Sequence, residues 1–502
     1  EDVVEREGYD FEGWQNLPAT MPGEDISVNG VLNPKTYTLT YYVDNEVYGE
    51  VENIKYKEAI TARELPSKEG HEFSGWSEIP ATMPAGNVAV KGYFTYTATF
   101  YAEDGETVLG TDKFTVKDAK LTEPEIPYKE GYIGIWSAYA IKAEDMNIRA
   151  LYVKESELQN AVAINATKGK AYNTLQSAIT AVSTDGEENT IKLLKNTNES
   201  TTTTSGQNIA LDLNGKTISV TAYRSPTGIS NNGTLTIKDS SENNNGNIIV
   251  EGTIYSYGIY NAGDLKIIQG NIKSTASIDN TYGIRQGTNG SIELLGGTIT
   301  ASGDDNVYGI CSYNDENIKI LGGVINATSK DRVSYGIYTY YSNLVIGNGN
   351  INATSKDKAS YGIYSNCSDV VIENGNINAI SKSNNQNSKA WGIYSYCDKK
   401  VTISETEITA EAVFSCGIEK VNGSLNISSG NINAKNGIYN YSGTVSIAGG
   451  NIISRQVGIL NRETGIVTIT GGTIQVTNDV SYAIGINNGN AGVVMVSGGT
   501  IK

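Results

Sequence analysis

The chain has 502 residues and a net charge of −17, from 38 Lys and Arg against 55 Asp and Glu. An acidic field repels phosphate backbones, so no nucleic-acid partner is expected. No apolar run approaches the roughly 20 residues that cross a bilayer, so no membrane insertion is expected within the chain. The 55 Gly residues, with many Asn, favour short strands joined by tight turns, because both residues tolerate a positive φ. The composition therefore predicts a mainly β protein, long enough for several domains or a repeat array.

The N-terminal third contains a repeat built around one glycine and aromatic block. The block EGYDFEGW at Glu7–Trp14 recurs as EGHEFSGW at Glu69–Trp76 and, shortened, at Glu130–Trp136. Alternating aromatic strands are predicted at Tyr37–Tyr42 and Tyr96–Tyr101, where complete copies begin. A PATMP segment also occurs twice, at Pro18–Pro22 and Pro80–Pro84.

These segments resemble the Listeria–Bacteroides repeat, also known as the internalin-type B-repeat, which occurs in tandem on bacterial surface proteins. The resemblance implies small β-grasp-like modules that act as a spacer or a weak contact surface. It predicts a partial module at residues 1–35, a complete one at 36–94, a diverged one at 95–153 and a linker at 154–162. Trp14, Trp76 and Trp136 are the expected core anchors of these modules. The chain opens inside a repeat, so we expect a trimmed start, and the missing signal peptide does not argue against secretion.

A second repeat system is predicted at residues 163–502. It opens with a helix at about 171–183, for which Asn173 or Thr174 is the N-cap, and this helix should cover one end of the array. The apolar face of the helix is formed by Leu175, Ala178, Ile179 and Val182. Two short signatures then alternate to the last residue. A Gly-Ile step occurs at Gly228, Gly258, Gly283, Gly309, Gly336, Gly362, Gly392, Gly417, Gly437 and Gly458, and a Gly-x-Ile step follows nearly every one.

Each of these units contains three short strands, and none of the units can bury its apolar side alone. Stacking would bury a continuous column, so the pattern predicts a parallel β-helix of about eleven turns. The turns resemble those of pectate-lyase-like β-helices of bacterial surface proteins, a resemblance of architecture that carries no activity. The last strand ends at Lys502 without a cap. We therefore expect the native chain to continue, or its apolar end to be covered, for example by end-to-end self-association.

Four aspartates form the one candidate site for a metal or for catalysis. Asp279, Asp305, Asp331 and Asp357 each precede a Tyr-Gly-Ile step on consecutive turns. Stacked carboxylates could share Ca²⁺ or act as an acid and base pair in glycoside hydrolysis. The favoured interpretation is that they are turn residues, neutralised by the basic residues beside them. These are Lys330, Arg332, Lys356 and Lys358. No other cofactor is expected, and the single histidine, His71, excludes mechanisms that need a catalytic histidine in the β-helix.

Tyrosines form the candidate binding surface. Tyr338, Tyr364 and Tyr394 directly follow Gly-Ile steps, and Tyr340 and Tyr396 lie two residues further along. In a strand these side chains point away from the buried isoleucine, so they should face outward. They could bind sugar rings or a protein, although a purely structural aromatic ladder is the favoured interpretation. A second ladder is predicted just before the glycines, at Tyr257, Tyr282, Tyr308, Tyr335, Tyr361 and Trp391.

The four cysteines form no close pair in the sequence, so a metal or redox motif is not supported. Cys367 and Cys397 occupy equivalent places in adjacent units, where a disulfide is geometrically feasible. Stacked free thiols are the favoured prediction.

Three functions are compatible with this sequence. The leading hypothesis is a non-catalytic, extracellular cell-surface protein that presents a β-helix for adhesion or display, with host or environmental glycans or surface proteins as partners. The second is a glycan-cleaving β-helix enzyme that uses the aspartates. The third is a structural spacer of a larger surface protein.

Overall fold

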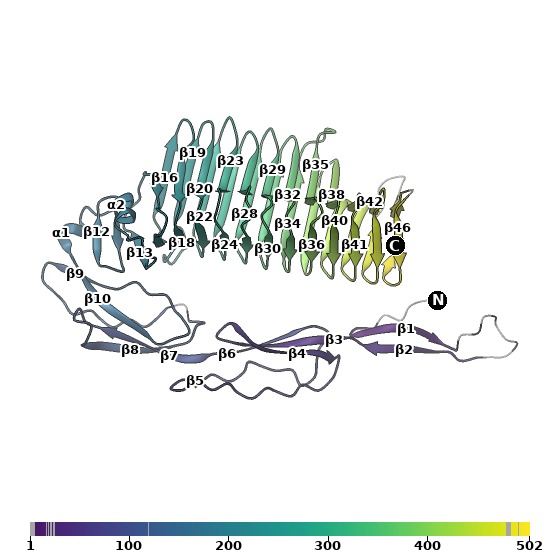
Figure 1. Cartoon of the computed structure of the whole chain (residues 1–502), viewed down its shortest axis with the longest axis horizontal. Helices are drawn as coiled ribbons and strands as arrows, with labels where there is room; N and C mark the ends of the chain where they lie inside the picture. Colours follow the sequence, from purple (N-terminus) through teal and green to yellow (C-terminus); the bar gives the residue numbers. More distant parts are fainter. Residues whose placement is uncertain are drawn as a thin grey trace. The chain divides into compact units, whose positions relative to one another are not determined.

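The computed structural model describes residues 6–502 except 17, 19, 21–22, 24–25, 119, 478–482 and 490. Most of the Pro18–Pro22 segment therefore lies outside the described residues. The chain divides into two units, Glu1–Tyr152 and Val153–Lys502 (Figure 1). It is mainly β, with 55% of residues in strands and 2% in helices, as the composition predicts. Neither helix in the described part of the chain is long and apolar enough to cross a membrane.

The first unit consists of three small sheets. A hairpin pairs β1 (Tyr9–Gln15) with β2 (Asn29–Pro34). A three-stranded sheet contains β3 (Thr36–Val43), β4 (Glu46–Lys55) and β6 (Val88–Gly92). A five-stranded sheet contains β5 (Glu72–Phe73), β7 (Phe94–Tyr101), β8 (Val108–Phe114), β9 (Tyr132–Trp136) and β10 (Met146–Lys154). In both larger sheets an antiparallel hairpin is joined by a parallel third strand, β6 beside β3 and β10 beside β7.

Aromatic side chains form the cores of these small sheets, because so few residues are available to bury. The Trp76 ring packs edge-on against the rings of Tyr41 and Phe73, and Trp136 packs against Phe100. Trp14 differs from the prediction. It is 37% exposed on the two-stranded β1–β2 hairpin, where Phe11 is the one aromatic ring packed against it among the described residues.

The second unit begins with an irregular cap. Part of the segment predicted as a linker is helical, as α1 (Glu155–Leu158). Strands β11 (Ala163–Asn165) and β12 (Lys170–Tyr172) follow, and then α2 (Leu175–Thr180). The helix is shorter than the predicted 171–183, because residues 171–172 pair with β11 as part of β12. The hydroxyl of Thr174 accepts the backbone N–H of Ser177, which confirms the predicted N-cap. The apolar side chains of α2 belong to the same buried cluster as the column of isoleucines, so the helix covers one end of the core as predicted.

Beyond the cap the chain forms a β-solenoid of about 11 turns (Figure 1). Each full turn contributes one strand to each of three parallel rows, which we call A, B and C. Row A is the larger part of a 15-stranded sheet, and rows B and C together form a 22-stranded sheet.

The bounds of the strands follow chain order within each row. Row A contains β13 (Glu188–Leu193), β15 (Asn208–Asp212), β18 (Thr234–Lys238), β21 (Asp264–Ile267), β24 (Ile292–Leu294), β27 (Ile318–Ile320), β30 (Leu344–Ile346), β33 (Val370–Ile372), β36 (Lys400–Ile403), β39 (Ser424–Ile427), β41 (Thr444–Ile447), β43 (Ile466–Ile469) and β46 (Val493–Val496). Row B contains β16 (Thr217–Ala222), β19 (Asn247–Gly252), β22 (Asn271–Ala276), β25 (Thr298–Gly303), β28 (Val324–Ser329), β31 (Asn350–Ser355), β34 (Gly375–Ser381), β37 (Thr406–Glu411), β44 (Thr473–Val476) and β47 (Thr500–Ile501). Row C contains β14 (Thr201–Thr202), β17 (Thr227–Asn231), β20 (Ser256–Asn261), β23 (Thr281–Gln286), β26 (Val307–Ser312), β29 (Ser334–Tyr340), β32 (Ala359–Asn366), β35 (Lys389–Tyr396), β38 (Phe414–Lys420) and β45 (Ile484–Asn488). Two long strands, β40 (Asn431–Asn440) and β42 (Asn451–Asn461), run through rows B and C.

The two sequence signatures place equivalent residues on top of one another. In row C the isoleucine of each Gly-Ile step pairs with that of the next turn, for example Ile337 with Ile363 and Ile363 with Ile393. These side chains are fully buried. The glycine before each isoleucine is required by packing, since a Cβ on Gly362 would lie 2.6 Å from the carbonyl oxygen of Gly392 and against the side chain of Ile377. At these steps rows B and C therefore pack too closely to admit a Cβ.

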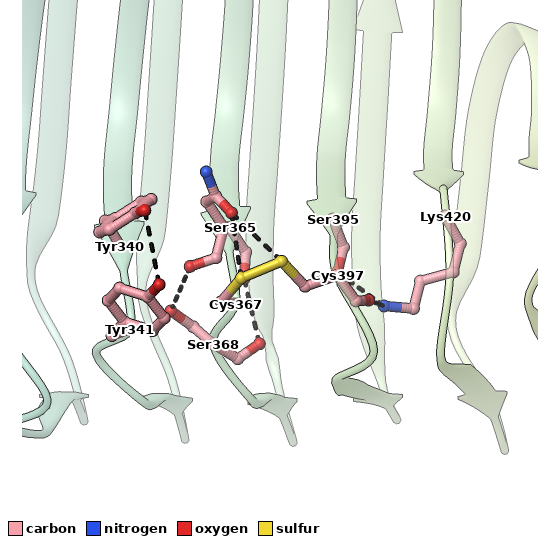
Figure 2. The surroundings of a disulfide bond; sticks show 9 residues. Tyr340, Tyr341, Ser365, Cys367, Ser368, Ser395, Cys397 and Lys420 are labelled. Atoms are coloured by element: carbon pink, nitrogen blue, oxygen red, sulfur yellow. Dashed lines mark hydrogen bonds between the residues drawn. A yellow bond between two sulfur atoms is a disulfide. The ribbon is translucent and has the colours of Figure 1, made fainter.

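A column of polar side chains also runs inside the solenoid at the end of row C, which the sequence did not predict. Asn440 donates its amide N–H to Asn461 at 2.8 Å, and Asn461 donates in turn to Asn488 at 2.7 Å. Lys420 occupies the same column and is fully buried. Its Nζ donates to the hydroxyl of Ser395 at 2.9 Å and to the backbone oxygen of Cys397 at 3.3 Å (Figure 2).

Candidate functional site

The outward side of row C carries two columns of stacked aromatic rings. In the inner column consecutive centroids are 4.7–5.2 Å apart and the ring planes are within 9° of parallel. The inner column consists of Tyr257, Tyr282, Tyr308, Tyr335, Tyr361 and Trp391. In the outer column, Tyr338, Tyr364 and Tyr394 stack with centroids 5.0 Å apart. The spacing follows from the parallel register, which puts each ring one strand spacing from the next.

The rings of the two columns pack against each other, and this packing determines which ring surfaces remain exposed to solvent. Rings of the outer column meet rings of the inner column edge-to-face, at interplanar angles of 81–89°. This is the arrangement that the ring quadrupoles favour. Both faces of Tyr364 are covered by Tyr338 and Tyr394. The middle ring of the outer column therefore offers its edge and phenol hydroxyl, and not a free face on which a sugar ring could stack.

The hydroxyls of the outer column stay protonated under ordinary conditions. Burial is the main cause that raises the pKa of Tyr338 and Tyr394 to about 12, and neighbouring phenols add to the effect. Each hydroxyl can therefore donate and accept a hydrogen bond.

Two charged residues that the sequence reasoning missed occupy the register of the outer column beyond its ends. Glu419 lies one turn after Tyr394, and Arg285 lies two turns before Tyr338, with Cys311 on the turn between them. Arg285 lies 5.1 Å above the ring centroid of Tyr282, a cation–π contact. At the other end, Glu419 accepts the indole N–H of Trp391 at 2.6 Å, and burial raises the pKa of its carboxyl. Both residues directly follow a Gly-Ile step, as the tyrosines do, and this spacing could have identified them.

The other two predicted tyrosines do not extend a ladder. Tyr340 and Tyr396 lie in register with Asn366, which separates them by one turn. Tyr340 packs against its neighbour Tyr341 with ring centroids 4.4 Å apart, and Tyr396 is 45% exposed. Of the five tyrosines predicted from the sequence spacing, the three of the outer column stack on one another and the other two do not.

The four predicted aspartates lie in the connections between rows B and C. Within the described residues, no three carboxylate, histidine or cysteine side chains gather closely enough to hold a metal ion. Arg332 lies 3.9 Å from Asp305, and Lys330 lies 3.8 Å from Asp331. Lys330 thus pairs with its neighbour Asp331 as expected, whereas Arg332 pairs with Asp305 on the preceding turn. Among the described residues no ion pair joins Asp357 to Lys356 or Lys358, so the expected neutralisation is not found there.

The prediction of free thiols at Cys367 and Cys397 was wrong. The structure contains a disulfide between them, with the Cα atoms 5.0 Å apart (Figure 2). Both residues occupy the same corner position on consecutive turns, so the strand spacing brings their Cα atoms within the range that a disulfide bridges. Cys311 and Cys416 are free and buried, and burial raises the pKa of the Cys311 thiol to about 12.

Thiol counting tests this disulfide directly. In denaturant without reductant, two thiols per chain should react with a maleimide, and four should react after reduction. Peptide mapping should place the unreactive pair at Cys367 and Cys397, with Cys311→Ser/Cys416→Ser as the control that leaves no reactive thiol before reduction. Four reactive thiols in protein purified under oxidising conditions would contradict the disulfide.

His71 is packed as a structural residue. Its ring lies 4.9 Å from that of Tyr96, and its Nδ1 is 3.1 Å from the backbone oxygen of Thr95.

Comparisons with known proteins identify one repeat of the first unit. Residues 37–82 match the Listeria-Bacteroides repeat domain family, which covers most of β3, β4 and β5. Internalin H from Listeria monocytogenes serovar 1/2a is 26% identical over 110 residues, which cover 18% of this chain and 20% of Internalin H. The chain thus matches about a fifth of the length of that relative. No solved structure matches the chain, so the pectate-lyase-like resemblance of the solenoid is not confirmed. The repeat and the similarity to Internalin H indicate a surface protein.

Proposed function

We propose that this chain is a non-catalytic part of an extracellular bacterial surface protein, in which the β-solenoid is the module presented for adhesion. The observation that carries the proposal is that one chain joins repeats of the kind matched at residues 37–82 to a long solenoid with an ordered aromatic surface. The proposal that it is not an enzyme is supported by the ion pairs at Asp305 and Asp331 and by the packed position of His71.

The aromatic surface offers a binding mode that differs from sugar stacking. The phenol hydroxyls of Tyr338, Tyr364 and Tyr394 recur every turn, about 5 Å apart, and can hydrogen-bond a glycan or a protein that lies along the axis. Rigid aromatic side chains lose little conformational entropy when they bind, which suits them to this role.

The test is binding of the whole chain to mucins and to a broad glycan panel, compared with the variant Tyr338→Phe/Tyr364→Phe/Tyr394→Phe. This variant keeps the ring stack and removes only hydroxyls, so its fold should be unchanged. We expect saturable binding that the variant loses. The matched control is Tyr335→Phe/Tyr361→Phe, which changes the inner column and should bind as the unmodified chain does.

The other outcomes separate the alternatives. Binding that all three proteins share would support adhesion and exclude the outer column as its site. No binding by the unmodified chain would contradict adhesion and favour the spacer. Release of reducing ends from any glycan would contradict the non-catalytic proposal.

A further inference from the structure

A groove lies along the edge where row B passes into row C, and no aromatic side chain lines it. It has a volume of about 520 Å³ and crosses the ends of β22, β25, β28, β31 and β34. Its lining includes the hydroxyl residues Thr275, Ser302, Thr328 and Thr354 and the charged residues Asp304, Lys330, Lys356 and Lys382. Nothing in the proposed adhesion surface uses these residues.

The lysines of the groove form a row in register. The backbone N–H groups of Lys330, Lys356 and Lys382 each donate to the preceding turn, to the oxygens of Gly303, Ser329 and Ser355 at 2.9–3.0 Å. Each lysine directly follows the last residue of a row B strand. Three ammonium groups are thus presented by consecutive turns, with backbone positions about 4.8 Å apart.

Buried serines hold these connections in one conformation. The hydroxyl of Ser329 donates to the backbone oxygen of Asp305 at 2.7 Å and accepts the N–H of Arg332. The hydroxyl of Ser355 does the same one turn later, with the oxygen of Arg332 at 2.7 Å and the N–H of Lys358. The sequences Ser-Lys-Asp-Arg and Ser-Lys-Asp-Lys therefore fold alike. A lysine row held by such bonds loses less backbone entropy on binding than one on a free loop.

The three connections that carry the lysines are basic, unlike the chain as a whole. The connections at residues 330–332, 356–358 and 382–388 carry five basic residues and two carboxylates, in a chain of net charge −17. The two connections before them, 277–280 and 304–306, carry Asp279, Asp304 and Asp305 and no basic residue, so the basic part of the edge begins at Lys330. Of these carboxylates only Asp304 lines the groove. Among the described residues, no ion pair involves Lys356, Lys358, Lys382 or Lys389, and all four are exposed. Their charges are available to an external anion.

Hydroxyls run parallel to the lysines. Thr275, Ser302, Thr328 and Thr354 stack in register on row B. A hydroxyl can donate to a carboxylate or phosphate oxygen and can also pair with a sugar hydroxyl. The next turn carries Ile380 at this position, so the hydroxyl row ends there.

We propose that this groove binds an anionic polysaccharide that runs along the solenoid axis. Lys330, Lys356 and Lys382 pair with successive anionic groups of the chain, and the threonine and serine hydroxyls pair with its sugar oxygens. The strongest contact is at Lys356 and Lys382, because Lys330 is already paired with Asp304 and Asp331. A nucleic acid is disfavoured, because a phosphodiester backbone presents fewer hydroxyls than a sugar chain to the row of threonine and serine hydroxyls.

The experiment measures binding of the whole chain to immobilised dextran, carboxymethyl dextran, dextran sulfate and polygalacturonate at low and high salt. We expect retention on the charged polymers, none on neutral dextran, and release at high salt because exposed charge contacts are screened. Lys356→Gln/Lys382→Gln should bind about tenfold more weakly. The matched control, Lys319→Gln/Lys400→Gln, makes the same charge change at exposed positions of row A and should bind as the unmodified chain does.

Each outcome bears on the proposal. The preferred charged polymer identifies the anionic group as a carboxylate or a sulfate. Equal weakening in both lysine variants would overturn the proposal, because net charge alone would then explain binding, and so would an absence of retention on every charged polymer. Equally tight binding of single-stranded DNA would also overturn it. The Tyr338→Phe/Tyr364→Phe/Tyr394→Phe variant should bind the charged polymers normally, so failure of this site and failure of the aromatic surface are distinguishable.

Discussion

Replacing Gly362 with alanine should lower the free energy of unfolding by about 3 kcal/mol, the upper part of the range for overpacked cores. The added Cβ would lie 2.6 Å from the backbone oxygen of Gly392 and would also press on the side chain of Ile377. The backbone of β32 is hydrogen-bonded to β29 on one side and to β35 on the other, so it cannot move aside without breaking hydrogen bonds of row C. Because every turn stacks on the next, we expect the damage to spread to neighbouring turns.

The matched control is Gly347→Ala, which lies at a turn after β30. There the nearest atom to a new Cβ is the side-chain Cδ2 of Leu321, 3.0 Å away on a partly exposed residue that can rotate. Urea unfolding followed by far-ultraviolet circular dichroism should show a large shift of the midpoint for Gly362→Ala and little for Gly347→Ala. Equal shifts would contradict the packing role that we assign to the Gly-Ile step.

The free energy of unfolding of the solenoid should rise with pH between the pKa that Lys420 has in the folded chain and the pKa that it has in the unfolded chain. Burial lowers the pKa of this amine to about 8, and among the described residues no carboxylate lies within ion-pair distance of it. In the unfolded chain a lysine has a pKa of about 10.4. Between these two values the unfolded state binds one proton more than the folded state. The free energy of unfolding therefore increases as pH rises, by about 2–3 kcal/mol from pH 8 to pH 10.

Comparison with Lys420→Met isolates this effect from the titration of the tyrosines, which both proteins share. The free energy of unfolding of the unmodified chain minus that of the variant should climb between pH 8 and pH 10 and be flat between pH 5 and pH 7. A difference that stays constant throughout would show that Lys420 titrates alike in both states, and would contradict the lowered pKa.

The repeating parts of the fold could be predicted from the sequence, because each repeated signature can pack against its copy on the next turn in only one register. A Gly-Ile step recurring once per turn leads directly to the register observed at Ile337 and Ile363. The same logic found the outer column at Tyr338, Tyr364 and Tyr394, since residues that follow aligned isoleucines must align as well.

The remaining features depend on contacts that spacing does not determine. One turn of separation between Cys367 and Cys397 is compatible with thiols or a disulfide. Lys356 and Lys358 were interpreted as partners of Asp357, but among the described residues no ion pair joins them. The sequence could not show this, because the conformation of the connection depends on hydrogen bonds such as those of Ser355. The inward position of Lys420 breaks the rule that charged residues face solvent, so no pattern of apolar residues could show it.

The connections between rows B and C also determine where the sequence is free to change length. Residues 382–388 form a longer connection than 356–358, yet Ile377 and Ile393 remain in register with their neighbours on both sides. A longer connection costs little extra closure entropy and adds no side chain to the core. Peptide segments grafted at this corner should thus leave the solenoid intact while they reshape the wall of the lysine groove, which makes ligand choice and folding separable properties of the molecule.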